Sequence, residues 1–175
     1  MTTTPDVTNP LLRELVAVHD MLRRDLRTCR ELADAALAGT ATGHLRHELD
    51  RLASRGPLFQ LKTTCMSYCQ VVHNHHHRED VTLFTAVRRS APHLDALVDR
   101  LEADHRLVSD ILDEVEEATS QLDAVDDTDA VRPADARRRL VDALTSLSDH
   151  LLEHLAREED ILAPVFLTWN HWPSE

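Results

Sequence analysis

Residues 147–165 read LSDHLLEHLAREEDILAPV, and this stretch decides the fold class. A helix advances by about 100° per residue, so side chains three and four positions apart share one face. That face carries Leu147, His150, Leu151, His154, Glu158, Ile161 and Val165. The stretch therefore predicts an amphipathic helix whose apolar face also carries histidine and glutamate.

Three other segments show the same pattern of an apolar face interrupted by polar residues. The first carries Leu12, Leu15, His19, Leu22 and Leu26. The second carries Leu61, Tyr68, Val72, His75, Glu79, Thr82 and Ala86. The third carries Leu94, Val98, Leu101, His105, Val108 and Leu112. Each face has a histidine near its middle, and the second and fourth faces add a glutamate four residues later, one helical turn along.

Glycine and proline divide the chain into four helical segments. The predicted segments are 10 to about 37, 44–89 with an interruption at 55–57, 92 to about 122, and 133–163, with Pro164 ending the last. Aromatic residues make up only 3% of the chain, and no stretch alternates in the manner of a strand. We therefore expect an all-α protein, an antiparallel up-down-up-down four-helix bundle over residues 1–167. Within it, residues 123–132 form an acidic solvated loop, and residues 168–175 form a C-terminal tail.

The composition excludes several classes of protein. The chain has 175 residues, with 19 Lys+Arg against 31 Asp+Glu, and a net charge of −12. Such a protein repels phosphate backbones, so nucleic acids and anionic membranes are not expected partners. No apolar run approaches the roughly 18 residues of a membrane span, and no signal peptide is recognisable, so we expect a cytoplasmic protein. The three cysteines, Cys29, Cys65 and Cys69, are interpreted as reduced core thiols.

The polar residues on the apolar faces indicate a metal site. Unpaired buried carboxylates each cost several kcal/mol, and a bound cation removes that cost. Imidazole and carboxylate ligands suit iron, manganese or zinc better than copper(I), and two ligand sets with two carboxylates indicate a bridged pair of ions. The competing interpretation is a helical interaction module without metal.

The order His19 … His75-His-His-Arg-Glu79 … His105 … His154-Leu-Ala-Arg-Glu158 resembles the H…HxxxE…H…HxxxE signature of hemerythrin-like proteins, the HHE cation-binding family, in an actinobacterial-type form. The resemblance extends from about residue 10 to 165 and includes Leu83-Phe84 and Leu162-Ala-Pro164 after the two HxxxE motifs. Two departures are Thr85 in place of the family's usual proline and the lack of the HxxxxD ending of oxygen-carrying hemerythrins.

The resemblance implies a four-helix bundle holding two iron ions, oxo- or hydroxo-bridged, with manganese or zinc as alternatives. Its terminal ligands would be His19, His75, His105 and His154, and its bridging ligands would be Glu79 and Glu158. Tyr68 and His150 are candidates for a further ligand, because each shares a face with an assigned histidine. A rotation by one residue would replace His75 and Glu79 with His76 and Asp80, and we favour the former pair. The other histidines, His44, His47, His73, His76, His77, His93 and His171, are expected on neighbouring or exposed faces.

An open position on iron in an apolar bundle admits small neutral molecules such as O2, NO or H2O2. We expect redox processing of NO or peroxide, a di-iron oxidoreductase activity, since a Tyr68 phenolate would oppose reversible oxygen carriage. The alternatives are an oxygen, redox or iron sensor that signals to a partner through Trp169 and Trp172, and reversible O2 binding. The expected partners are the small ligand and an unidentified electron donor, and the expected state is a monomer or weak homo-oligomer.

Overall fold

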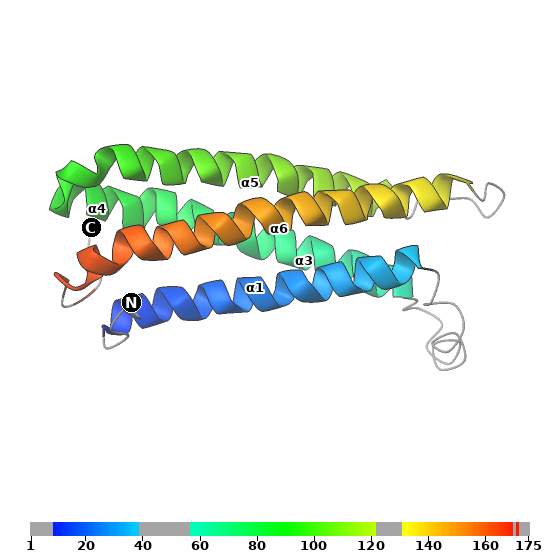
Figure 1. Ribbon diagram of the computed structural model, residues 1–175, viewed down its shortest axis with the longest axis horizontal. Coiled ribbons are helices and arrows are strands. Elements are labelled where there is room, and N and C mark those ends of the chain that lie inside the picture. Colours follow the sequence, from blue (N-terminus) through cyan, green and yellow to red (C-terminus); the bar gives the residue numbers. More distant parts are fainter. Residues whose placement is uncertain (1–8, 39–56, 122–130, 170, 172–175) are drawn as a thin grey trace, which may run out of the picture.

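The computed structural model describes residues 9–38, 57–121, 131–169 and 171 (Figure 1). Its elements are α1 (Pro10–Leu37), α3 (Pro57–Arg78), the π-helix η2 (Glu79–Leu83), α4 (Phe84–Ser90), the 3-10 helix η3 (Pro92–Leu94), α5 (Asp95–Gln121) and α6 (Val131–Phe166). The described part of the chain contains no strand, which confirms the all-α prediction. In this part no helix is long and apolar enough to cross a membrane.

The four long helices pack as a bundle. Helix α1 contacts α3 and α6, and α5 contacts the same two helices, so the four close into a ring (Figure 1). Contacts between α1 and α6 join Asn9 to Phe166 at one end and Arg30 to Ser148 further along. Helices α1 and α6 therefore run in opposite directions.

The first helix begins at an asparagine cap. The side-chain Oδ1 of Asn9 accepts hydrogen bonds from the backbone N–H of Leu11 at 2.8 Å and of Leu12 at 3.2 Å. Such a cap satisfies N–H groups that have no partner within the helix. The Nδ2 group of Asn9 also donates to the backbone oxygen of Phe166 at 2.6 Å. One residue thus starts α1 and ties it to the end of α6.

The apolar core falls into two clusters. One contains Leu22, Leu26, the three cysteines, Tyr68 and Val72, with residues of α5 and α6. The other contains Leu11, Leu12, Leu15, Leu83, Phe84, Leu162 and Phe166, with residues of α5. The buried histidines and glutamates have sequence positions between these clusters: His19, for example, is fully buried between Leu15 and Leu22. The predicted apolar face of α1 is confirmed along its whole length.

A π-helix changes the register at the end of α3. The N–H of Phe84 donates to the oxygen of Glu79, five residues earlier, where an α-helix would use four. The wider turn rotates the following residues. As a result Thr82, which an unbroken α-helix would bury, is exposed, whereas Leu83 and Phe84 are buried. The prediction for Thr82 was therefore wrong.

The last helix continues past the predicted stop at Pro164 and ends at Phe166. Proline inside a helix removes a hydrogen bond and clashes with the preceding turn. Here it stands in the last turn, and burial of Val165 and Phe166 offsets the cost. The ring of Trp169 then packs edge-on against Phe166, with centroids 5.5 Å apart. Predictions for Trp172, most of the acidic loop, His44 and His47 lie outside the described residues.

Candidate metal centre

Seven side chains from four segments of the bundle meet in its interior. They form two groups, in each of which the ligand atoms lie within 4.8 Å of one another. The two-histidine group is His19, His75, Glu79 and Glu158, and the three-histidine group is His76, His105 and His154. The structure thus brings together all six of the ligands predicted from the sequence and adds His76.

The two glutamates lie between the two groups of histidines. Glu79 Oε1 is 3.2 Å from His75 Nε2, and its other oxygen is 3.7 Å from His105 Nε2. Glu158 Oε2 is 3.3 Å from His19 Nε2 and 3.8 Å from His154 Nε2. Each carboxylate therefore faces a histidine of the two-histidine group and a histidine of the three-histidine group, which is the arrangement that a bridging ligand requires.

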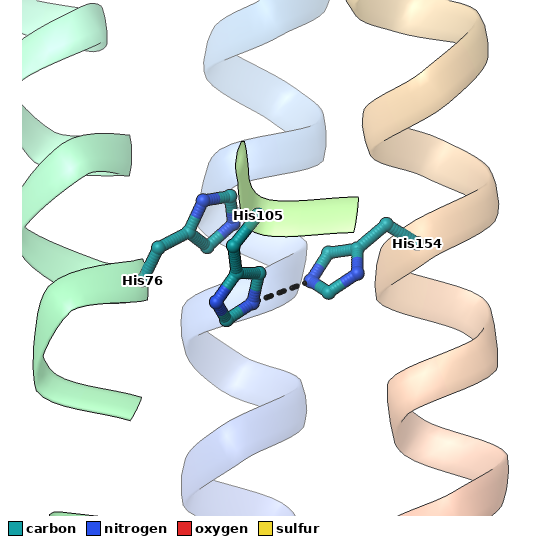
Figure 2. Close-up of side chains that lie close together, drawn as sticks. All are labelled: His76, His105 and His154. Atoms are coloured by element: carbon teal, nitrogen blue, oxygen red, sulfur yellow. Dashed lines mark hydrogen bonds between the residues drawn. The ribbon is translucent and has the colours of Figure 1, made fainter. Parts of the chain in front are cut away.

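The three-histidine group draws one ring from each of α3, α5 and α6, and Figure 2 shows the three rings converging. The rings of His76 and His105 are stacked, with centroids 4.0 Å apart and planes 8° apart. A hydrogen bond of 3.0 Å joins His105 Nε2 to His154 Nε2 (Figure 2). All three rings are buried, so their nitrogen atoms converge at a point shielded from solvent.

His76 was wrongly expected on a neighbouring or exposed face, since only 5% of its surface is exposed. Successive residues of a helix differ by about 100° in direction, and the centre of the bundle lies between the directions of His75 and His76. Both residues therefore point inward, each to a different group. The sequence did contain a sign of this arrangement, the alternative pair His76 and Asp80. In the structure Asp80 also belongs to the surroundings of the site, since its Oδ1 lies 2.7 Å from His105 Nδ1.

Carboxylates outside the site hold two of the histidine rings in place. Each accepts a hydrogen bond from the Nδ1–H group, which leaves Nε2 directed to the centre. The pairs are His19 with Glu159 at 2.8 Å and His105 with Asp80 at 2.7 Å, whereas His154 Nδ1 lies 3.7 Å from Asp104, beyond hydrogen-bond distance. Arginines hold two of these carboxylates: Arg23 bonds Glu159 at 2.8 Å, and Arg157 bonds Asp104.

The ligand atoms fit a bound cation. Most buried side-chain N and O atoms that lack a hydrogen-bond partner among the described residues belong to this site: His19 Nε2, His75 Nε2, His76 Nε2 and both carboxylate oxygens of Glu79 and of Glu158. Buried polar groups without partners are costly, and a metal ion supplies the missing partner for imidazole and carboxylate alike. The donor set of five imidazoles and two carboxylates suits iron, manganese or zinc.

Burial and mutual charge set the protonation of the metal-free site. Burial lowers the pKa of His75 to about 3 and of His154 to about 4. For His19 burial alone would lower the pKa, but the nearby carboxylates of Glu158, Glu159 and Glu79 outweigh it and raise the pKa to about 11. Burial, reinforced by the charge of Glu158, raises the pKa of Glu79 to about 8. Neutral imidazoles such as His75 and His154 are in the form that binds metal.

These pKa shifts predict that the metal-free protein is most stable near pH 6.5. Below this pH the unfolded chain protonates His75 and His154 but the folded chain does not, so stability rises with pH up to about 6.5. Above it the folded chain keeps the protons of His19 and Glu79 that the unfolded chain has released, so stability falls as pH rises to about 8. Each uncompensated proton changes the free energy of unfolding by about 1.4 kcal/mol per pH unit. Urea unfolding in chelator at about pH 5, 6.5 and 8 checks this, and stability that keeps rising to pH 8 contradicts it.

His150 is exposed and lies apart from both ligand groups. It shares a side of α6 with His154, but the buried arc of this helix extends the other way, toward Leu151 and Leu155. His150 is thus turned outward, and the structure contradicts its candidacy as a further ligand. The predictions for His93, His77 and His171 are confirmed, because these side chains are exposed. His73 is half-buried on a neighbouring face, 3.4 Å from Ser109 Oγ.

Tyr68 is buried, but in the apolar cluster that contains the cysteines. Its hydroxyl has no hydrogen-bond partner within the described part of the chain. Burial, and then the nearby groups Cys29, Cys69 and Asp25, raise the pKa of Tyr68 above its usual value, so the phenol stays neutral. No ligand of the two groups is among these neighbours, and the structure gives no support to a phenolate ligand.

We therefore expect Tyr68→Phe to leave the optical spectrum of the metal-loaded protein unchanged. The substitution removes a buried hydroxyl without a partner, so the free energy of unfolding should rise by roughly 1 kcal/mol. Absorption spectra and urea unfolding of the two proteins measure both effects. Loss of a charge-transfer band in the variant would restore Tyr68 as a ligand.

A cavity of about 620 Å³ opens beside the two-histidine group, between α1 and the α3–η2 segment. Of the ligands, His75 and Glu79 line it. Its walls also include Glu14, Leu15, Val18, Met21, Val71, Asn74, Arg78, Thr82 and Leu83. The two-histidine group is therefore the side of the site that a molecule from solvent can approach.

Comparison with known proteins agrees with this geometry. The sequence matches the family model described as the hemerythrin HHE cation binding domain over residues 11–166. Comparisons with curated proteins and with solved structures give no significant match. The matched range covers nearly the whole chain and includes all seven residues of the two ligand groups, and such domains bind metal, typically iron. This protein therefore belongs to the hemerythrin HHE cation-binding domain family.

Proposed function

We propose that this protein is a non-heme di-iron protein that binds and reduces a small oxidant, NO or hydrogen peroxide, inside an antiparallel up-down-up-down bundle. The observation that carries the proposal is the placement of Glu79 and Glu158. Each of them faces a histidine in both of the two groups. Two donor sets that share two carboxylates suit a pair of ions better than a single ion. The proposed location of the protein is the cytoplasm, and the proposed reduction also needs an electron donor, which is not identified.

The residues divide into two unequal sets. His19 and His75 would hold one ion, the three-histidine group would hold the other, and Glu79 and Glu158 would bridge them. The two-histidine side offers one imidazole fewer and adjoins the cavity. When bound, iron supplies an open coordination position and reversible one-electron redox chemistry. The chain supplies the approach to that position from the cavity side.

The protein's own side chains prepare this site. Glu159 Oε1 accepts a hydrogen bond from the Nδ1–H group of His19, and Asp80 Oδ1 accepts one from that of His105, so each Nε2 is the nitrogen left to bind metal. A carboxylate partner makes the imidazole a more basic ligand, which favours the more oxidised metal. This effect, in place of a Tyr68 phenolate, now supports reduction of an oxidant over reversible oxygen carriage.

The cavity selects what reaches the site. Leu15, Val18, Met21 and Leu83 form apolar walls next to His75 and Glu79. Apolar walls favour small neutral molecules such as NO, O2 and hydrogen peroxide over anions. Arg78, Asn74 and Thr82 are exposed at the outer side of the cavity, where they remain in contact with water.

Metal analysis and spectroscopy test the proposal. We expect about two irons per chain in protein purified without an affinity tag, and charge-transfer bands that change on addition of NO or peroxide with consumption of the oxidant. The control is the same protein after removal of iron by chelator. Reversible O2 binding without turnover would support a carrier. A protein without bound iron, equally stable with and without chelator, would support an interaction module. Either outcome contradicts the proposal.

A further inference from the structure

Three cysteines form a cluster in the core beyond the metal centre. Cys29 comes from α1, and Cys65 and Cys69 come from α3. All three are free thiols and are at most 1% exposed. Cys29 and Cys65 belong to one buried core cluster, and their side chains are close enough to influence each other's protonation across the two helices.

The position of this pair follows from the register of the two helices. The rings of His19 and His75 lie 5.2 Å apart and mark one level of the α1–α3 contact. Cys29 lies ten residues after His19, and Cys65 lies ten residues before His75. With a rise of about 1.5 Å per residue, Cys29 and Cys65 each lie about 15 Å along their helix from the paired histidines. The two cysteines are therefore at the same level of the bundle.

These thiols are poor targets for direct attack. Contact with Cys65 and burial raise the pKa of Cys29 far above its usual value, and burial raises the pKa of Cys69 to about 12. The thiolate, not the thiol, is the nucleophile, so protonated and buried thiols react slowly with a dissolved oxidant. Direct oxidation of this pair by a dissolved oxidant is therefore expected to be slow.

Tyr68 lies on α3 in the interval between the thiols and the metal centre. It follows Cys65 by three residues and precedes His75 by seven, and it belongs to the same buried cluster as all three cysteines. The other neighbours in this cluster include Leu22, Leu26 and Val72, which cannot be oxidised. An oxidisable ring thus stands between an oxidant-binding site and an oxidisable pair.

We propose that Cys29 and Cys65 are an internal two-electron reductant that forms a disulfide when hydrogen peroxide is reduced at the metal centre. This inference rests on the proposed function. The two thiols lose two electrons and two protons and form one S–S bond, while the O–O bond of peroxide breaks and two waters form. The electrons leave through the α1–α3 core, and Cys69 remains a thiol.

The test follows the thiols of the iron-loaded protein after one equivalent of peroxide. Thiol titration in denaturant should fall from three per chain to one, and peptide mapping without reductant should find the peptides of Cys29 and Cys65 linked, lighter by two hydrogen atoms. Metal-free protein treated in the same way should keep three thiols. Cys69→Ser is the matched control and should still form the link, whereas Cys65→Ser should not.

Each other outcome overturns the inference in a distinguishable way. Peroxide that is consumed while all thiols remain leaves the proposed function standing and removes the internal reductant. The same disulfide in metal-free protein shows direct oxidation and removes the coupling to the metal centre. Iron-loaded protein that consumes no peroxide removes both the proposed function and the inference. The mapping of the unsubstituted protein needs no variant, so a variant that fails to fold does not affect the result.

Discussion

Glu79→Met is expected to abolish binding of the metal pair and, at the same time, to stabilise the metal-free protein. The Glu79 side chain is buried, and neither of its oxygens has a hydrogen-bond partner in the ranges that the structure describes. Without metal, these atoms cost stability, because a buried polar group without a partner costs about 1–3 kcal/mol. Methionine has a similar shape but no such atoms, so the free energy of unfolding in chelator should rise by about that amount.

Elemental analysis and urea unfolding in chelator measure the two effects of Glu79→Met. The matched control is Glu153→Met on α6, because Glu153 is exposed and bonds Arg157 on its own helix. This control should change neither metal content nor stability by a comparable amount. A Glu79→Met protein that still binds two ions would contradict the bridging role of Glu79.

Each bound metal ion is expected to raise the melting temperature by about 8–16 °C. A ligand that binds only the folded state stabilises it by about 4 kcal/mol per site at a thousand times its dissociation constant. In a chain of this size each kcal/mol shifts the melting temperature by about 2–4 °C. The reason lies in the site, where eight buried side-chain atoms of the ligand residues lack a hydrogen-bond partner among the residues that the structure describes. Thermal unfolding with metal and with chelator measures the difference.

Two histidines of α6 provide matched variants for this shift. His154→Ala removes a buried ring from the three-histidine group, and His150→Ala removes an exposed ring one turn earlier. The first variant should lose most of the metal-dependent shift, and the second should keep it. Equal shifts in the two variants would mean that metal binds elsewhere.

The sequence predicted the helices well where strong apolar periodicity coincides with clear ends. Helix α1 begins and ends at the predicted residues, and the leucines predicted on its apolar face, Leu12, Leu15, Leu22 and Leu26, are buried. The exposed position of Thr82 could not be predicted, since the π-helix at Glu79–Leu83 changes the period locally. A sequence pattern that assumes a constant angle per residue carries no information about such a change.

The candidate ligands show the same division. His19 and Glu158 stood out because a polar residue on a leucine-rich face needs a partner, which is a property of the pattern alone. His76 did not stand out, since its own helix places it about 100° from His75. Its inward direction depends on where α5 and α6 lie relative to α3, and its ring stacks on His105 of α5.

The sequence by itself therefore determined that the chain is helical, that its apolar faces carry paired histidine and glutamate, and that it resembles the HHE family. Local periodicity encodes these properties, because each depends on spacing within one helix. Only the tertiary structure decided that Glu79 and Glu158 face both groups, that His150 points to solvent and that Cys29 and Cys65 share one core cluster. These properties depend on the rotation of each helix against its neighbours, which packing of the whole core sets and no single segment contains.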